Sequence, residues 1–184
     1  MHVVVPSFVQ NTRRFRGPDA GDPLASAMAD FEKIKTYFSE AKSYLAEKEH
    51  ATVNLKLEAA KLLFEKKQKL FVHADQVKQM LLAIDFVKDF GFDVVIVGGS
   101  ESWQIADLLK QNNIAVILGQ EHALPTMDDD DVDQPYKTPA MLQKAGVLFA
   151  LNDPDENTRY RNLPFVGVLH PHVYKEASKK VIYR

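Results

Sequence analysis

The chain has 184 residues, of which 46% are hydrophobic and 26% are charged, and its formal net charge at pH 7 is -2. This length suits one domain with a sizeable core, and so small a charge gives no long-range attraction to nucleic acid or to an anionic membrane. The chain has no cysteine, which excludes disulfides, thiolate zinc sites and a cysteine nucleophile. Any metal must therefore be held by His, Asp or Glu.

The apolar runs of the sequence are too short to suggest a membrane segment. The longest are strand-sized, far below the ~20 residues that a membrane-spanning helix requires. At the N-terminus a brief apolar run precedes the basic residues, which is the reverse of the order in a signal peptide. We therefore expect a cytoplasmic protein whose partners include neither a membrane nor a nucleic acid.

The N-terminal part of the chain predicts one short strand and two helices. Residues 2–5 are β-prone and Pro6 ends them, and the arginines of the following loop either lie in a solvated connection or contact an anion. Asp22-Pro23 joins a capping carboxylate to a proline at the first helical position, so we predict a helix over 23–48. A second apolar stripe predicts another helix over 54–66. Two successive helices at this point suggest either an insertion among βα repeats or the tail of something larger.

The clearest pattern follows and predicts a strand, a helix and a second strand. A β-prone run over 69–72 closes on His73. Apolar residues then recur every three or four positions up to Phe90, as in a helix with one buried face, and Gly91 stands where a left-handed cap is expected. Residues 93–97 are almost all β-branched, which suits a strand covered on both faces. In such a βαβ unit the two strands are parallel.

The same alternation continues beyond this unit. We predict a helix capped by Ser100, a strand over 114–118, a helix that begins at Thr138-Pro139 and stops at Gly146, and a strand over 147–151. The order βα, βα, βα, β predicts an α/β fold of parallel units. This fold is either a slice of a (β/α) TIM-type barrel or a small open sheet.

These elements give an expected domain organisation. Residues 1–66 form a lead-in of loop and helix, and residues 67–184 form the parallel βα units, within one compact domain overall. In parallel α/β folds the chemistry lies at the carboxyl ends of the strands, where His73 and Gly98-Gly99 both stand. His73 is either a ligand or a hydrogen-bonded rim histidine. The glycines make either a tight turn or an anion site, without the complete pattern of dinucleotide binding.

Several motifs taken together resemble the amidohydrolase superfamily. They are LFVHADQVKQMLLAIDFVKDFGFDVVIVGGS, then HALP, then PYKTPAMLQKAGVLFALND after a polar loop, and finally RNLPF. Within the superfamily the chain resembles the imidazolonepropionase-like metal-dependent hydrolases, and residues 24–165 are similar to the C-terminal half of their barrel. The resemblance implies a partial TIM-type barrel and hydrolysis of a C–N bond in an amide or cyclic amide.

The resemblance also implies a metal site. In that family a His-x-His pair lies on the first strand, histidines end the fifth and sixth strands, and an aspartate ends the eighth. His73 matches the fifth-strand histidine, and Asp153 is the best match to the eighth-strand aspartate, with Asp155 as the alternative. Both would be metal ligands, and Asp153 would also be the catalytic base. Zinc is the expected cofactor because neutral imidazole suits it and because it lowers the pKa of water.

Two positions depart from the family pattern. Gly98-Gly99 stands where the sixth-strand histidine would be, and no His-x-His pair begins the chain, since His170-Pro171-His172 lies near the opposite end. Because a catalytic zinc takes three protein ligands, we expect a truncated or degenerate hydrolase. It would take a small-molecule substrate and self-associate or pair with the missing half of the barrel. The alternative is a non-catalytic α/β module with a binding or structural role.

Two polar features of the sequence each allow two interpretations. The aspartates at 128–131, with Asp133, form either a solvated loop or a weak cation site, since like charges repel one another and resist packing. His122 follows the strand predicted over 114–118, and it belongs either to a polar loop or to the functional rim of the barrel.

Overall fold

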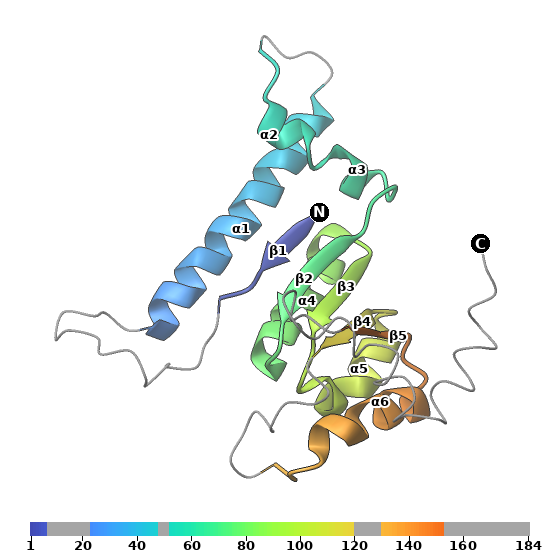
Figure 1. The fold of residues 1–184 in the computed structure, drawn as a ribbon. Helices are drawn as coiled ribbons and strands as arrows, with labels where there is room; N and C mark the ends of the chain where they lie inside the picture. The colour runs from blue at the N-terminus through green and yellow to red at the C-terminus, as the bar shows by residue number, and fades with distance from the viewer. Residues whose placement is uncertain (7–22, 48–51, 120–129, 153–184) are drawn as a thin grey trace, which may run out of the picture.

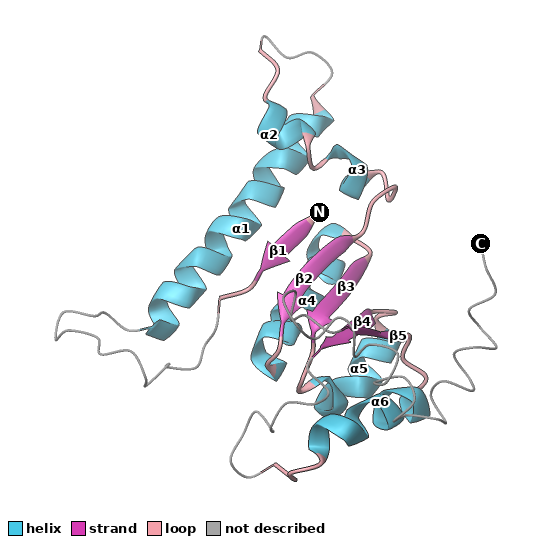
Figure 2. Ribbon diagram, viewed as in Figure 1, coloured by secondary structure: helices cyan, strands magenta, loops and turns pink. Residues whose placement is uncertain are grey.

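The computed structural model describes residues 1–6, 23–47, 52–119 and 130–152. In this part of the chain a parallel sheet is flanked by helices (Figures 1 and 2). The strands are β1 (His2–Val4), β2 (Leu70–Ala74), β3 (Val94–Gly98), β4 (Ala115–Gly119) and β5 (Phe149–Asn152). The helices are α1 (Pro23–Ala46), α2 (Leu55–Glu58), α3 (Lys61–Phe64), α4 (Val77–Phe90), the 3₁₀ helix η1 (Ser102–Ile105), α5 (Ala106–Gln111) and α6 (Gln134–Ala145).

The strands lie side by side in the order in which the chain makes them. Each neighbouring pair is parallel, from β1 with β2 to β4 with β5. Right-handed crossovers between strands in this order place the helices on one face of the sheet, as in a (β/α) barrel, whereas a doubly wound sheet reverses its order. The predicted α/β fold of parallel units is therefore confirmed. Among the described residues the sheet is not closed, and β1 and β5 are its edges.

The hydrophobic core lies between the sheet and the helices. Alternate strand residues face it, including Leu70, Val72 and Ile96, which are fully buried. On the helix side aromatic rings fill the space, and Phe38 of α1 lies edge-on to Phe86 of α4, with ring centroids 5.5 Å apart. Such pairs add to the free energy gained from burial. The same cluster contains these further rings: Phe31, Phe64, Phe90 and Phe92.

The opposite face of the sheet carries the functional candidate. Because side chains alternate along a strand, Phe71 and His73 of β2 point away from Leu70 and Val72. The register aligns Val4, His73 and Val97 across three strands on this opposite face, which we call the open face. The side chain of Val4 is 68% exposed there. In a closed (β/α) barrel this face is the interior.

The long helix α1 packs one side on the core and keeps the other in solvent. Tyr37 and Tyr44, at the edge of its apolar stripe, hydrogen-bond the segment that leads into α2: the Tyr37 hydroxyl donates to the carbonyl oxygen of Lys56 (2.5 Å), and the Tyr44 hydroxyl accepts from the backbone N–H of Asn54 (3.1 Å). Burial raises the pKa of Tyr37. In the described segments of the chain, no helix combines the length and apolarity needed to cross a membrane.

Two predictions about helices were wrong in detail. The single helix predicted over 54–66 is two short helices, α2 and α3, because the backbone N–H of Ala60 and of Leu63 bond three residues back instead of four. Asn54 still caps the first of them, its side chain accepting from the N–H of Lys56. Ser100 does not cap the next helix, because η1 begins two residues later and the Ser100 hydroxyl donates to the carbonyl oxygen of Asp75 (3.2 Å).

The aromatic cluster leads to a stability prediction. Phe38→Ala removes a fully buried ring that contacts four other aromatic rings, and we expect it to lower the free energy of unfolding by about 3–5 kcal/mol. Denaturation by urea would measure the loss. Leu55→Ala is the control, because Leu55 is 79% exposed, and its effect should stay within about 0.5 kcal/mol. An equally small effect of Phe38→Ala would contradict the assignment of the core.

Candidate functional site

Two histidines from neighbouring strands meet on the open face of the sheet. Nδ1 of His2 in β1 lies 3.0 Å from Nε2 of His73 in β2. The ring of His2 also stacks on Phe71, with centroids 4.9 Å apart and planes 13° from parallel. His73 is half-buried and His2 is exposed. The structure thus places the predicted residue His73 beside a second imidazole that the sequence interpretation did not include.

The register of β1 explains this meeting. His2 aligns with Phe71, and Val4 aligns with His73, so both histidines point to the same face from diagonal positions. Backbone hydrogen bonds at both ends of β1 hold this register. The N–H of Phe71 donates to the carbonyl oxygen of Met1 (2.8 Å), and the N–H of Val5 donates to the carbonyl oxygen of His73 (3.2 Å). The prediction of a strand over 2–5 is confirmed, but its pairing with β2 joins residues too far apart in sequence for a local pattern to reveal.

The turn after β2 brings a carboxyl group to the same edge of the sheet. The carboxyl of Asp75 accepts a hydrogen bond from the backbone of Ser100, and it lies against Gly98 at the end of β3. Loss of solvent around this carboxyl raises its pKa, while the bond from Ser100 and the charge of His73 act in the opposite direction. His73 and Asp75 thus lie at the same edge of the sheet, where Asp75 as a residue is still exposed, while Ala74 between them is buried in the core.

Two buried side chains brace this edge of the sheet. The side-chain oxygen of Gln79 accepts from the backbone N–H of Asp75 (3.0 Å), and its nitrogen donates to the carbonyl oxygen of Val5 (3.0 Å). The carboxylate of Glu101 accepts a hydrogen bond from the N–H of Val77 at the start of α4 (2.8 Å). Its negative charge also interacts favourably with the positive end of the helix dipole there. The carboxyl ends of β1, β2 and β3 are thus fixed to one another, and such fixed strand ends can hold functional side chains precisely.

Gly98-Gly99 forms a tight turn. A Cβ atom at Gly98 would lie 2.4 Å from Oδ1 of Asp75, and one at Gly99 would lie 2.8 Å from Cγ1 of Val116. Both residues have positive φ, 103° and 66°. Any side chain at position 98 would therefore collide with the carboxyl of Asp75.

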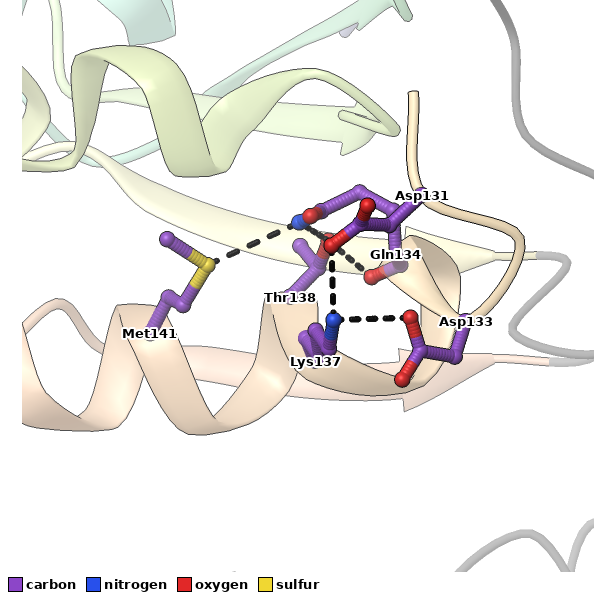
Figure 3. Close-up of polar contacts among 6 residues, drawn as sticks. All are labelled: Asp131, Asp133, Gln134, Lys137, Thr138 and Met141. Atoms are coloured by element: carbon purple, nitrogen blue, oxygen red, sulfur yellow. Dashed lines mark hydrogen bonds and ion pairs between the residues drawn. The ribbon is translucent and has the colours of Figure 1, made fainter. Parts of the chain in front are cut away.

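Two aspartates of the acidic run form ion pairs with a lysine (Figure 3). Nζ of Lys137 lies 2.8 Å from the carboxylate of Asp131 and 2.7 Å from that of Asp133. The lysine lowers the pKa of Asp133. Beside them Gln134 is buried, and its side-chain nitrogen lies 3.4 Å from the hydroxyl of Thr138. Asp131 and Asp133 thus lie just before α6 and pair with a lysine of its first turns. The helix starts at Gln134, with a proline in its first turn, ahead of the predicted Thr138-Pro139.

Several predicted site residues lie outside the described part of the chain. They are Asp153, Asp155, His122, His170 and His172, together with the aspartates at 128 and 129. Asp153 follows in sequence directly after Asn152, the last residue of β5. Within the described segments, no three or more His, Asp or Glu side chains form a group able to hold a metal ion. The described site therefore consists of the imidazole pair with Asp75 at the adjacent turn.

The close approach at Gly98 can be tested. Gly98→Ala should lower the free energy of unfolding by roughly 1–3 kcal/mol, because φ is positive and the new methyl meets the carboxyl of Asp75. Gly91→Ala is a matched control, since Gly91 also has positive φ (70°) but no atom within 4 Å of a Cβ. The difference between the two losses, measured by urea denaturation, isolates the steric contact.

The double variant Gly98→Ala with Asp75→Ala completes this test. It should recover part of the loss, because the shortened side chain no longer reaches position 98. Losses at Gly98 and Gly91 that are equal, with no recovery in the double variant, would contradict the contact.

Comparison with known proteins found one informative likeness. No family model and no curated protein matches the chain. Its fold is similar to that of an amidohydrolase from Thermotoga maritima MSB8, with a TM-score of 0.60 and 26% sequence identity. The match covers 84% of this chain and 44% of that one, so the chain spans less than half the length of its structural neighbour. The parallel sheet thus resembles part of an amidohydrolase barrel.

Proposed function

We propose that the chain is a metal-dependent hydrolase of the amidohydrolase type, related to the imidazolonepropionase-like branch, which acts on the C–N bond of an amide or cyclic amide. The observation that carries the proposal is the position of His73. It stands near the carboxyl end of a strand, on the face away from the helices, in a sheet that resembles part of an amidohydrolase barrel. This is where parallel (β/α) folds keep their chemistry.

The residues present suit a divalent metal of the zinc type. Nε2 of His73 is turned to the open face and meets only another imidazole nitrogen there among the described residues. Neutral imidazole and carboxylate are the ligands that zinc takes when thiolates are absent. We assign His73 and Asp153 as ligands. When bound, zinc supplies a Lewis acid that lowers the pKa of water towards neutrality.

The protein's own contribution follows from these groups. His73 would hold its ligand nitrogen in place through the backbone of β2, which pairs with strands on both sides. The carboxylate of Asp153 would take the proton of the attacking water at an oxygen and pass it to the departing nitrogen. The small-molecule substrate would lie over the open face, above the carboxyl ends of the strands.

Metal analysis tests this proposal. We expect the purified protein to contain zinc, iron or manganese, and His73→Ala and Asp153→Asn to lose metal affinity by about tenfold or more, because even outer-shell partners of a metal contribute that much. Asp131→Asn is the control, since this carboxylate is paired with Lys137. Elemental analysis by mass spectrometry gives the content. A wild-type protein that neither retains nor takes up any of these metals would rule out the proposal.

We also propose that two copies complete one another across the open face and the sheet edges. An open face with an exposed apolar side chain, and edge strands with unpaired backbone groups, both favour association. The chain corresponds to less than half of the neighbouring amidohydrolase, so a barrel of that kind needs further strands.

The assembly prediction has an internal control. Val4 and Val53 are both 68% exposed, but only Val4 lies on the open face. We expect Val4→Glu to shift the protein towards monomer and Val53→Glu to leave the association unchanged, as measured by light scattering after gel filtration. A wild-type protein that is monomeric at all concentrations would contradict the assembly.

A non-catalytic α/β module is the second candidate function. The packing of Asp75 against Gly98 favours it, because a sixth-strand ligand at position 98 would collide with this carboxyl. Its role would be to bind a ligand or a partner without chemistry. A stable monomer without metal affinity is the result that distinguishes it from the hydrolase.

A further inference from the structure

The distance between the two imidazole nitrogens on the open face also suits two ligands of one metal ion. Two ligands of one zinc ion, each at a bond length of about 2.0–2.1 Å, stand roughly 2.9–3.4 Å apart for angles between octahedral and tetrahedral. Nδ1 of His2 and Nε2 of His73 are 3.0 Å apart. The same separation fits an N–H···N hydrogen bond, in which the two nitrogens share one proton. At this separation both nitrogens are close enough to bind one cation, which would lie to one side of the line between them.

The surroundings of His2 fix its ring in this orientation. Its stacking on Phe71 holds the imidazole plane, and the short strand β1 is held at both ends by backbone bonds to β2. Preorganised ligands bind a metal more tightly because less side-chain entropy is lost on binding. The His2 side chain is exposed, so a hydrated cation can reach the pair directly.

We propose that His2 is a metal ligand, and that His2 and His73 together form a two-imidazole site for a borderline divalent transition cation such as zinc or cobalt. This inference rests on the proposed function, to which it adds a second histidine on a different strand. Imidazole favours zinc, nickel and copper over magnesium and calcium, so the site should discriminate against the last two.

The absence of native cysteine makes a spectroscopic test sharp. His2→Cys places a single thiolate in the protein. If the side chain at position 2 reaches the metal, Co²⁺ bound to this variant must show the sulfur-to-cobalt charge-transfer absorption that thiolate coordination produces, and wild-type protein with Co²⁺ must lack it. The experiment uses the full chain without a histidine tag and Co²⁺ as the only added metal.

Affinity measurements complete the design. His2→Phe keeps a ring to stack on Phe71 but removes both nitrogens, and we expect it to weaken Zn²⁺ and Co²⁺ binding by about tenfold or more, as does His73→Phe. Ile117→Val is the control on the same face: Ile117 aligns with Val97 in β3, and the change removes no donor atom and no ring that stacks on His2. Circular dichroism and the thermal midpoint of each variant confirm that it folds.

The outcomes separate this inference from the proposed function. A thiolate band in His2→Cys with weakened binding in His2→Phe supports the inference. Zinc binding that needs His73 and Asp153 but is unchanged in His2→Phe, with no thiolate band, overturns the inference and leaves the proposed function standing. A thiolate band with full affinity in Asp153→Asn supports the imidazole pair and overturns the assignment of Asp153. No metal binding by the wild-type protein overturns both.

Discussion

The pairing of β1 with β2 is the contact on which the site depends. It joins two histidines that stand 71 positions apart in the chain and brings their nitrogens to 3.0 Å. The strand β1 has only three residues, so its own hydrogen bonds are few. Gln79 reinforces it by accepting from the backbone after β2 and donating to the backbone after β1. One buried amide therefore connects the two strand ends and the first turn of α4.

The two faces of the sheet carry different kinds of side chain. On one face the strand residues pack against helices, and the aromatic rings of α1, α4 and the neighbouring loops provide the burial that stabilises the fold. Because the strands follow one another in chain order, these helices all lie on that single face of the sheet. The other face, on which the imidazoles lie, carries half-buried and exposed side chains such as His73 and Val4, together with the buried Val95. This division separates the strand residues that stabilise the fold from those that we propose to bind a ligand.

The sequence predicted most of the elements but only part of the site. Periodicity located α4 and its cap at Gly91, and the run of β-branched residues located β3, because both patterns are local and have a direct physical cause. His73 was found through its motif, and the tight turn at Gly98-Gly99 was one of two interpretations. His2 and the packing of Asp75 against Gly98 were missed. Each depends on which strands become neighbours, and no local pattern records that. The available signal for His2 was its position at the start of a predicted strand. The signal for the packing of Asp75 was an aspartate two positions after His73.

The edge position of β1 couples any ligand of the imidazole pair to the local fold. Short edge strands open more readily than central ones, and the opening of β1 would carry His2 away from His73. A cation held by both rings binds only the paired state, so its binding free energy adds to the pairing of the strands. By the same linkage, the contacts that keep β1 in register, including the amide of Gln79 and the stack of His2 on Phe71, would raise the affinity of the proposed site for a cation. A short strand that places only Val3 in the hydrophobic core would therefore control the imidazole pair directly.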